Sequence, residues 1–130
     1  MRLNAKPLKK NKVAIVFLFG SKITKTVHPG SDIDIGVVFE DEKLRIKKPS
    51  EVYGDLYQVF SKAFYTSAPD IVYLREAPLS LQFKAINEGK IIYQSSGKYL
   101  ADYREEVMIK YFDFQFVEDC FNRVLLGKAS

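Results

Sequence analysis

The sequence predicts an α/β (α+β) domain in which a mixed central sheet is flanked by helices and a long helix ends the chain. Short runs that are apolar or that alternate between apolar and polar residues are typical of strands. They alternate along the chain with longer stretches whose apolar residues recur every three or four positions, which is typical of helices. The 130 residues suffice for one hydrophobic core, so we expect a single domain over 1–130. Hydrophobic residues make up 47% and charged residues 28%, which favours a globular protein over a disordered one.

Four short segments have strand patterns: 13–19, 32–39, 69–74 and 90–93. The first is continuously apolar and stops at Gly20, which is typical of a strand buried on both faces. The second alternates, with Asp32, Asp34 and Gly36 on one face and apolar residues on the other. The first strand is therefore expected in the middle of the sheet, and the second is expected to have one polar face.

Three longer segments have helical spacing: 50–66, 78–89 and 97–125. Ser50 is expected to cap the first helix, Pro78 lies in the first turn of the second, and Gly89 ends it. A further short helix is expected after Gly20. Residues 40–49 are charged and lack apolar periodicity, which predicts an exposed hairpin or loop.

Charge and cysteine content limit the function classes. The net charge of +4 comes partly from two basic stretches, 6–12 and 45–48, which we interpret as solvated surface rather than a nucleic-acid site. No apolar run is long enough to cross a membrane and no signal peptide is recognisable, so a cytoplasmic protein is expected. Cys120 is the only cysteine, which excludes an internal disulfide, and its apolar neighbours predict a buried position.

The Gly20-Ser21 pair and the Asp32-Ile33-Asp34 segment form the pattern that carries chemistry. Residues two apart on a strand point to the same side, so both carboxylates can bind one metal site. Such oxygen ligands suit Mg²⁺ or Mn²⁺, which often share substrate phosphate oxygens. A glycine lets the backbone approach phosphate, and backbone amides with the Ser21 hydroxyl can donate to a triphosphate.

Asp70 at the head of the third strand is a candidate third carboxylate. An aspartate in this position is usually a cap or faces solvent. If its strand lies beside the second strand, however, Asp70 can bind a second metal ion and accept the proton of an acceptor hydroxyl. Three carboxylates that repel one another are explained better by bound cations than by a structural role.

These residues, with the segments 68–74 and 86–93, resemble the DNA polymerase beta type nucleotidyltransferase superfamily over 13–117, in particular the small MNT branch that pairs with HEPN proteins. The resemblance implies a polymerase beta-like nucleotidyltransferase fold. It also implies an antitoxin of the MntA type, which transfers AMP from ATP to a tyrosine of a HEPN ribonuclease. Asp32, Asp34 and Asp70 would then be catalytic metal ligands, and Gly20 and Ser21 would bind the nucleotide.

Two alternatives remain open. After Gly-Ser the family commonly has an arginine and then a glycine, whereas this chain has Lys22 and Lys25, so a non-catalytic module that neutralises a partner by contact is the second hypothesis. Transfer to a small molecule such as an aminoglycoside is disfavoured because the chain has no second domain to bind it. The single histidine, His28, is interpreted as a surface turn residue.

The last helix is unusually aromatic. Its aromatic residues surround more of the helix than one buried face needs: Tyr99, Tyr103, Tyr111, Phe112, Phe114, Phe116 and Phe121. We expect most of them in the core and the remainder at a docking surface for a protein partner. The sequence does not fix the number of copies, so a homo-oligomer also stays open.

Overall fold

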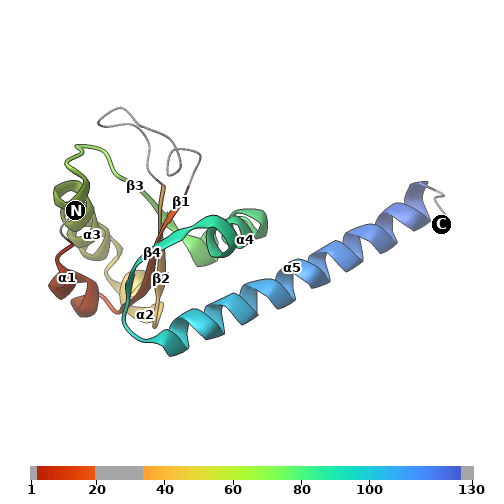
Figure 1. The fold of residues 1–130 in the computed structure, drawn as a ribbon, viewed down its shortest axis with the longest axis horizontal. Helices are drawn as coiled ribbons and strands as arrows, with labels where there is room; N and C mark the ends of the chain where they lie inside the picture. Colours follow the sequence, from red (N-terminus) through yellow and green to blue (C-terminus); the bar gives the residue numbers. More distant parts are fainter. Residues whose placement is uncertain (1–2, 20–33, 127–130) are drawn as a thin grey trace.

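A computed structural model describes residues 3–19 and 34–126. Within these ranges a sheet lies between two helical layers, and one long helix extends away from this body (Figure 1). The strands are β1 (Val13–Phe19), β2 (Asp34–Phe39), β3 (Asp70–Tyr73) and β4 (Lys90–Gln94). The helices are α1 (Ala5–Lys10), α2 (Lys43–Lys47), α3 (Pro49–Phe64), α4 (Leu79–Glu88) and α5 (Gly97–Leu126), with a 3-10 turn η1 (Leu74–Glu76).

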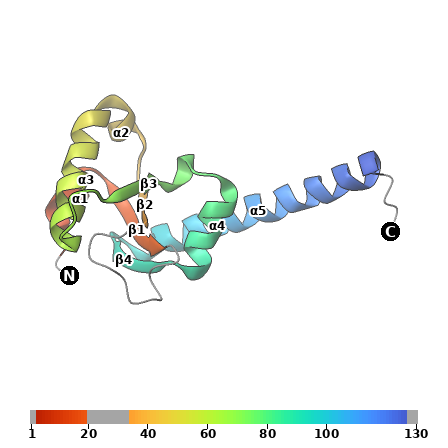
Figure 2. The ribbon, with the colours of Figure 1, turned by 90° about the horizontal axis from the view of Figure 1, so that it is seen from above.

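The sheet is mixed, as predicted. Its strand order is β3-β2-β1-β4. β1 pairs antiparallel with β2 and β4, whereas β2 and β3 are parallel. The continuous apolar run of β1 is explained by this central position, because helices cover the sheet on both sides (Figure 2).

Two apolar clusters fill the two sides of the sheet. Val16, Ile35 and Val37 pack in the cluster under α1 and α3. Phe17, Phe19 and Val38 pack with residues of α4 and α5 in the other cluster. The alternation along β2 therefore assigns its even-numbered residues, which include Asp34, to the side of α4 and α5.

The helix α3 begins one residue earlier than predicted. Pro49 is its first residue, and no side chain caps it, so the prediction that Ser50 is the cap is wrong. The fixed φ of proline is already suited to the first helical position, which explains the earlier start. The predicted apolar face is confirmed, since Val52, Leu56 and Phe60 are buried.

The segment 40–49 contains a short helix, α2, so the prediction of a hairpin or loop is wrong. Polar contacts hold it together with Leu44, which is partly buried against the core. The Asp41 side chain accepts a hydrogen bond from the backbone of Lys43, and Arg45 forms ion pairs with Glu42 at 2.6 Å and Glu76 at 2.8 Å. A helix stabilised in this way leaves no apolar periodicity in the sequence.

The helices α4 and α5 confirm the predicted end at Gly89 and the predicted long last helix. Pro78 precedes α4 as its N-cap instead of lying in its first turn. None of the described helices is long and apolar enough to cross a membrane. Cys120 is only partly buried, because it lies on a part of α5 beyond the body, so the prediction that it is buried is wrong.

Candidate active site

Asp34 and Asp70 lie side by side at one edge of the sheet. They are Cα partners in the parallel pairing of β2 with β3, and each is the first residue of its strand. Adjacent strands are about 4.8 Å apart, and paired residues of parallel strands point to the same side. Val38 and Val72, which share the alternation of these aspartates, pack on the α4 and α5 side. Both carboxylates therefore lie on that face.

Asp70 is exposed and Asp34 is half-buried, so solvent reaches both residues. Oxygen ligands of this kind match the preference of Mg²⁺ and Mn²⁺. In the ranges 3–19 and 34–126, no three carboxylate, histidine or cysteine side chains gather as a metal site. Asp34 and Asp70 thus supply a pair among the described residues, and the third predicted ligand, Asp32, is not one of these residues.

Gly20, Ser21 and Asp32 lie outside the described residues, as do Lys22, Lys25 and His28. Their flanks are described, however. Phe19, the last residue of β1, is the Cα partner of Asp34. The chain consequently leaves β1 and enters β2 at the edge that carries Asp34 and Asp70.

The apolar side chains of Phe19 and Leu74 pack over Gly36, two residues after Asp34 on the same strand. Gly36 has the same facing as Asp34, and a Cβ added there would be 2.8 Å from Cδ1 of Leu74 and 2.9 Å from Cε1 of Phe19. Only glycine therefore lets these two side chains close over β2. The alternation in the sequence places Gly36 on the polar face but does not predict this contact. A glycine inside a strand, a common sign of close approach, was the signal for it.

The connection before β3 is held in place on both sides of Ser67. The Tyr57 hydroxyl of α3 donates a hydrogen bond to the backbone oxygen of Ser67. The backbone amide of Ala68 donates to Oγ1 of Thr66 at 3.2 Å, and Pro69 is buried. These contacts fix the position at which Asp70 enters the sheet.

The basic stretches meet away from this edge. Lys12, Lys43 and Lys47 line a shallow groove of about 290 Å³ together with Asp41. Lys12 precedes β1, whereas Asp34 pairs with the last residue of that strand. This basic groove is thus at the opposite end of β1 from the two carboxylates and does not contribute to the site.

Comparison with known proteins identifies similar sequences and folds. The family model described as polymerase beta, nucleotidyltransferase matches residues 5–98, a range that contains both aspartates. No curated protein matches. A toxin–antitoxin structure with AMP-PNP is 25% identical, with a TM-score of 0.63, over 93% of this chain and 94% of that one. An MNT antitoxin in complex with the tri-AMPylated HEPN toxin of Shewanella oneidensis is 23% identical, with a TM-score of 0.59, over 93% and 91%.

Proposed function

We propose that this chain, which belongs to the polymerase beta nucleotidyltransferase family, transfers AMP from ATP to a tyrosine hydroxyl of a HEPN toxin and so acts as an antitoxin. The observation that carries the proposal is the parallel pairing of Asp34 with Asp70 on one face of the sheet. A structural role does not explain two carboxylates held side by side, because they repel each other. A metal-dependent transfer does.

In this proposal Asp32 and Asp34 hold Mg²⁺ or Mn²⁺, and Asp70 completes the metal site. The acceptor oxygen forms a bond to the α-phosphorus of ATP, the bond to the β-phosphate oxygen breaks, and pyrophosphate leaves. Asp70 accepts the proton that the acceptor hydroxyl loses. Gly20 and Ser21 would bind the β and γ phosphates. The metal supplies positive charge that neutralises the phosphates.

The similar structures support the choice of nucleotide and acceptor. One is a toxin–antitoxin complex with AMP-PNP, an analogue of ATP, and another contains a HEPN toxin that carries three AMP groups. The family match extends from residue 5 to residue 98, and the described residues after it belong to the helix α5. A partner protein that delivers its own tyrosine fits these described residues better than a small molecule, because a helix alone offers little to orient a small acceptor.

Substitution of the paired aspartates tests the proposal. We expect Asp34→Asn and Asp70→Asn to lower AMP transfer from labelled ATP to the HEPN protein by about 100-fold or more, the range for loss of a catalytic acid–base group. Their melting temperatures should equal or exceed that of the wild type, because a repulsive charge is lost. Asp102→Asn removes an exposed carboxylate from α5 and is the matched control, with wild-type transfer expected.

Two outcomes would contradict the proposal. Wild-type transfer in both variants would show that the pair is not the metal site. Neutralisation of the toxin by the wild-type chain without any label transfer would favour the alternative of a non-catalytic module.

A further inference from the structure

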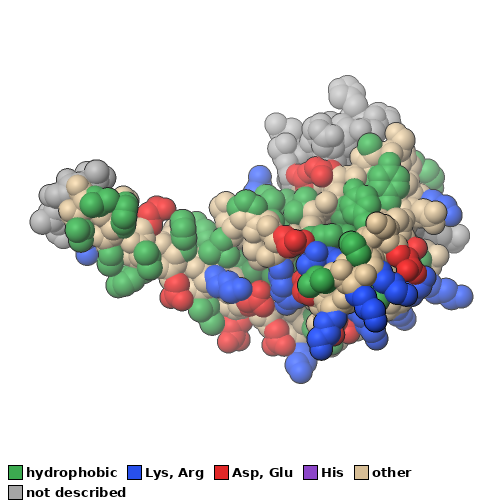
Figure 3. Space-filling model, turned by 180° about the vertical axis from the view of Figure 1, so that it is seen from behind, with side chains coloured by type: hydrophobic (Ala, Val, Ile, Leu, Met, Phe, Trp, Pro, Cys, Tyr) green, Lys and Arg blue, Asp and Glu red, His purple; other side chains and the backbone are tan. Residues whose placement is uncertain are grey.

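The end of α5 exposes an unusual amount of apolar surface. We call residues 112–125 the projecting half, because they lie beyond the body of the protein (Figure 1). Four phenylalanines in it, Phe112, Phe114, Phe116 and Phe121, are between 54% and 70% exposed. Figure 3 shows green side chains along this extension. Soluble proteins seldom leave so many large apolar side chains in water unless another molecule covers them.

These side chains form two stripes on opposite sides of the helix. With about 100° of rotation per residue, Phe114 and Phe121 continue the face on which Tyr103 and Val107 are buried in the body. We call this face the inner stripe. Phe112 and Phe116 are rotated from it by roughly half a turn and form the outer stripe. A helix that is apolar on opposite sides is typical of one with neighbours on both.

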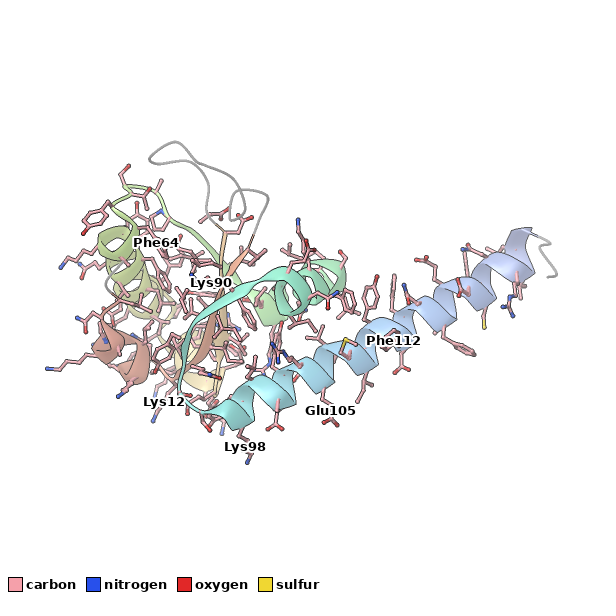
Figure 4. The ribbon with its side chains drawn as sticks, in the orientation of Figure 1. Lys12, Phe64, Lys90, Lys98, Glu105 and Phe112 are labelled. Carbon is pink, nitrogen blue, oxygen red and sulfur yellow. The ribbon has the colours of Figure 1, made fainter. Side chains whose placement is uncertain are left out.

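The inner stripe loses its cover at Tyr111. The Tyr111 ring stacks on Phe83 of α4, with the ring centres 4.0 Å apart. On the other side of the helix, Phe112 of the outer stripe, labelled in Figure 4, is 54% exposed. Phe114, on the same face as Tyr111, is 57% exposed. The apolar face thus continues past the point where the body stops covering it.

The two stripes favour a protein cleft over other occupants. An amphipathic helix that lies on a membrane has one apolar face opposite a face rich in Lys and Arg. Here the helix carries acidic residues instead: Asp113 lies between the stripes, and Glu118 lies beside the inner one. A second copy of α5 packed alongside would cover one stripe and leave the other in water. A partner that contacts the helix on two sides covers both.

We propose that the projecting half inserts into an apolar cleft of the HEPN partner, which contacts the inner and outer stripes together. The identity of this partner rests on the proposed function. The length of the structural match supports it. The match to the toxin–antitoxin structure with AMP-PNP covers 93% of this chain, so it includes much of the projecting half. The region matched to a chain from a toxin–antitoxin structure therefore extends beyond the body of this protein.

Affinity for the HEPN partner of the proposed function tests each stripe separately. The variants are Phe114→Ser with Phe121→Ser for the inner stripe, and Phe112→Ser with Phe116→Ser for the outer. Calorimetry with full-length proteins should show at least tenfold weaker binding for either double variant. Affinity for ATP and the melting temperature should stay at wild-type values, because none of these side chains is buried. Asn122→Ser, a polar exposed position on the same half, is the control and should bind normally.

Each of the remaining outcomes would contradict one part of this proposal. Normal binding by both double variants, with AMP transfer intact, would overturn the docking surface alone. A loss confined to one stripe would overturn insertion into a cleft. Self-association of the free chain in sedimentation, abolished by the same substitutions, would assign the stripes to a second copy. A wild-type chain that binds the HEPN protein through both stripes but transfers no AMP would overturn the proposed function and leave this inference standing.

Discussion

The two halves of α5 have similar apolar spacing and opposite surroundings. In residues 97–111, the anchored half, Tyr103 and Val107 are fully buried against the sheet and α4. In the projecting half, Phe114 and Phe121 occupy the same helix face and are more than half exposed. Apolar periodicity therefore predicts where a helix forms but not which molecule covers it. The following substitutions compare the halves through the free energy of unfolding.

The largest effect is expected for Tyr103→Ala in the anchored half. This side chain is fully buried, and its hydroxyl donates a hydrogen bond to Oε1 of Gln82 at 2.9 Å. Removal leaves a cavity and an unpaired amide oxygen, which together should lower the free energy of unfolding by about 3–5 kcal/mol. Urea denaturation measures the loss. Phe116→Ala, which removes an exposed ring, should change it by less than about 0.5 kcal/mol. Equal losses would show that the halves do not differ.

A smaller loss of stability is expected for Arg75→Ala, which removes the contacts of this η1 residue with β2 and α5. Arg75 donates a hydrogen bond to the backbone oxygen of Phe39 at 2.7 Å, pairs with Glu106 at 3.3 Å, and lies over the Tyr103 ring. The ion pair is partly exposed and contributes little, so we expect a loss of about 1–2 kcal/mol, mostly from the hydrogen bond. Arg75→Lys should recover less than half of it, because an ammonium cannot reproduce these contacts together. Full recovery of stability in Arg75→Lys would show that only the positive charge of Arg75 matters.

The anchored half should also respond to alkaline pH. Burial raises the pKa of Tyr103 above its usual value of about 10. Above that pH the unfolded chain releases the proton while the folded chain keeps it, so stability is complete below about pH 10 and falls as the pH rises further, by at most about 1.4 kcal/mol per pH unit. Tyr103→Phe lacks this proton. The difference in stability between wild type and Tyr103→Phe, measured from about pH 9 to 11, should shrink accordingly. A constant difference would contradict the burial of this hydroxyl.

The same contrast explains what sequence reasoning could and could not establish. It predicted four strands and the central β1, because these follow from local patterns. It placed Asp70 near Asp34 only if their strands are neighbours, a condition that the pairing of β2 with β3 meets. It missed α2, which depends on Arg45 reaching Glu76 across 31 residues. It missed the closure of Phe19 and Leu74 over Gly36 for a similar reason. It expected most aromatics of α5 in the core, yet Phe112, Phe114, Phe116 and Phe121 are exposed. The assignments of Gly20, Ser21 and Asp32 stay predictions.

The smallest effect is expected for Val124→Ala in the projecting half, which is compared with the same substitution at Val107 in the anchored half. Val107 is fully buried, whereas Val124 is 81% exposed. Val107→Ala removes two buried carbons and leaves a small cavity, so it should cost about 2 kcal/mol. Val124→Ala removes nothing from the core, and alanine favours the helix over a β-branched residue by less than about 0.7 kcal/mol, so the free energy of unfolding should stay constant or rise slightly. Because the chemical change is identical, any effect of the substitution itself cancels between the two variants.

Urea denaturation of the isolated chain at low protein concentration measures both variants. A loss at Val124 comparable to that at Val107 would mean that the projecting half is already covered in the absence of a partner. With the HEPN protein in excess, Val124→Ala should become destabilising if the partner covers Val124, and it should stay neutral if the partner does not.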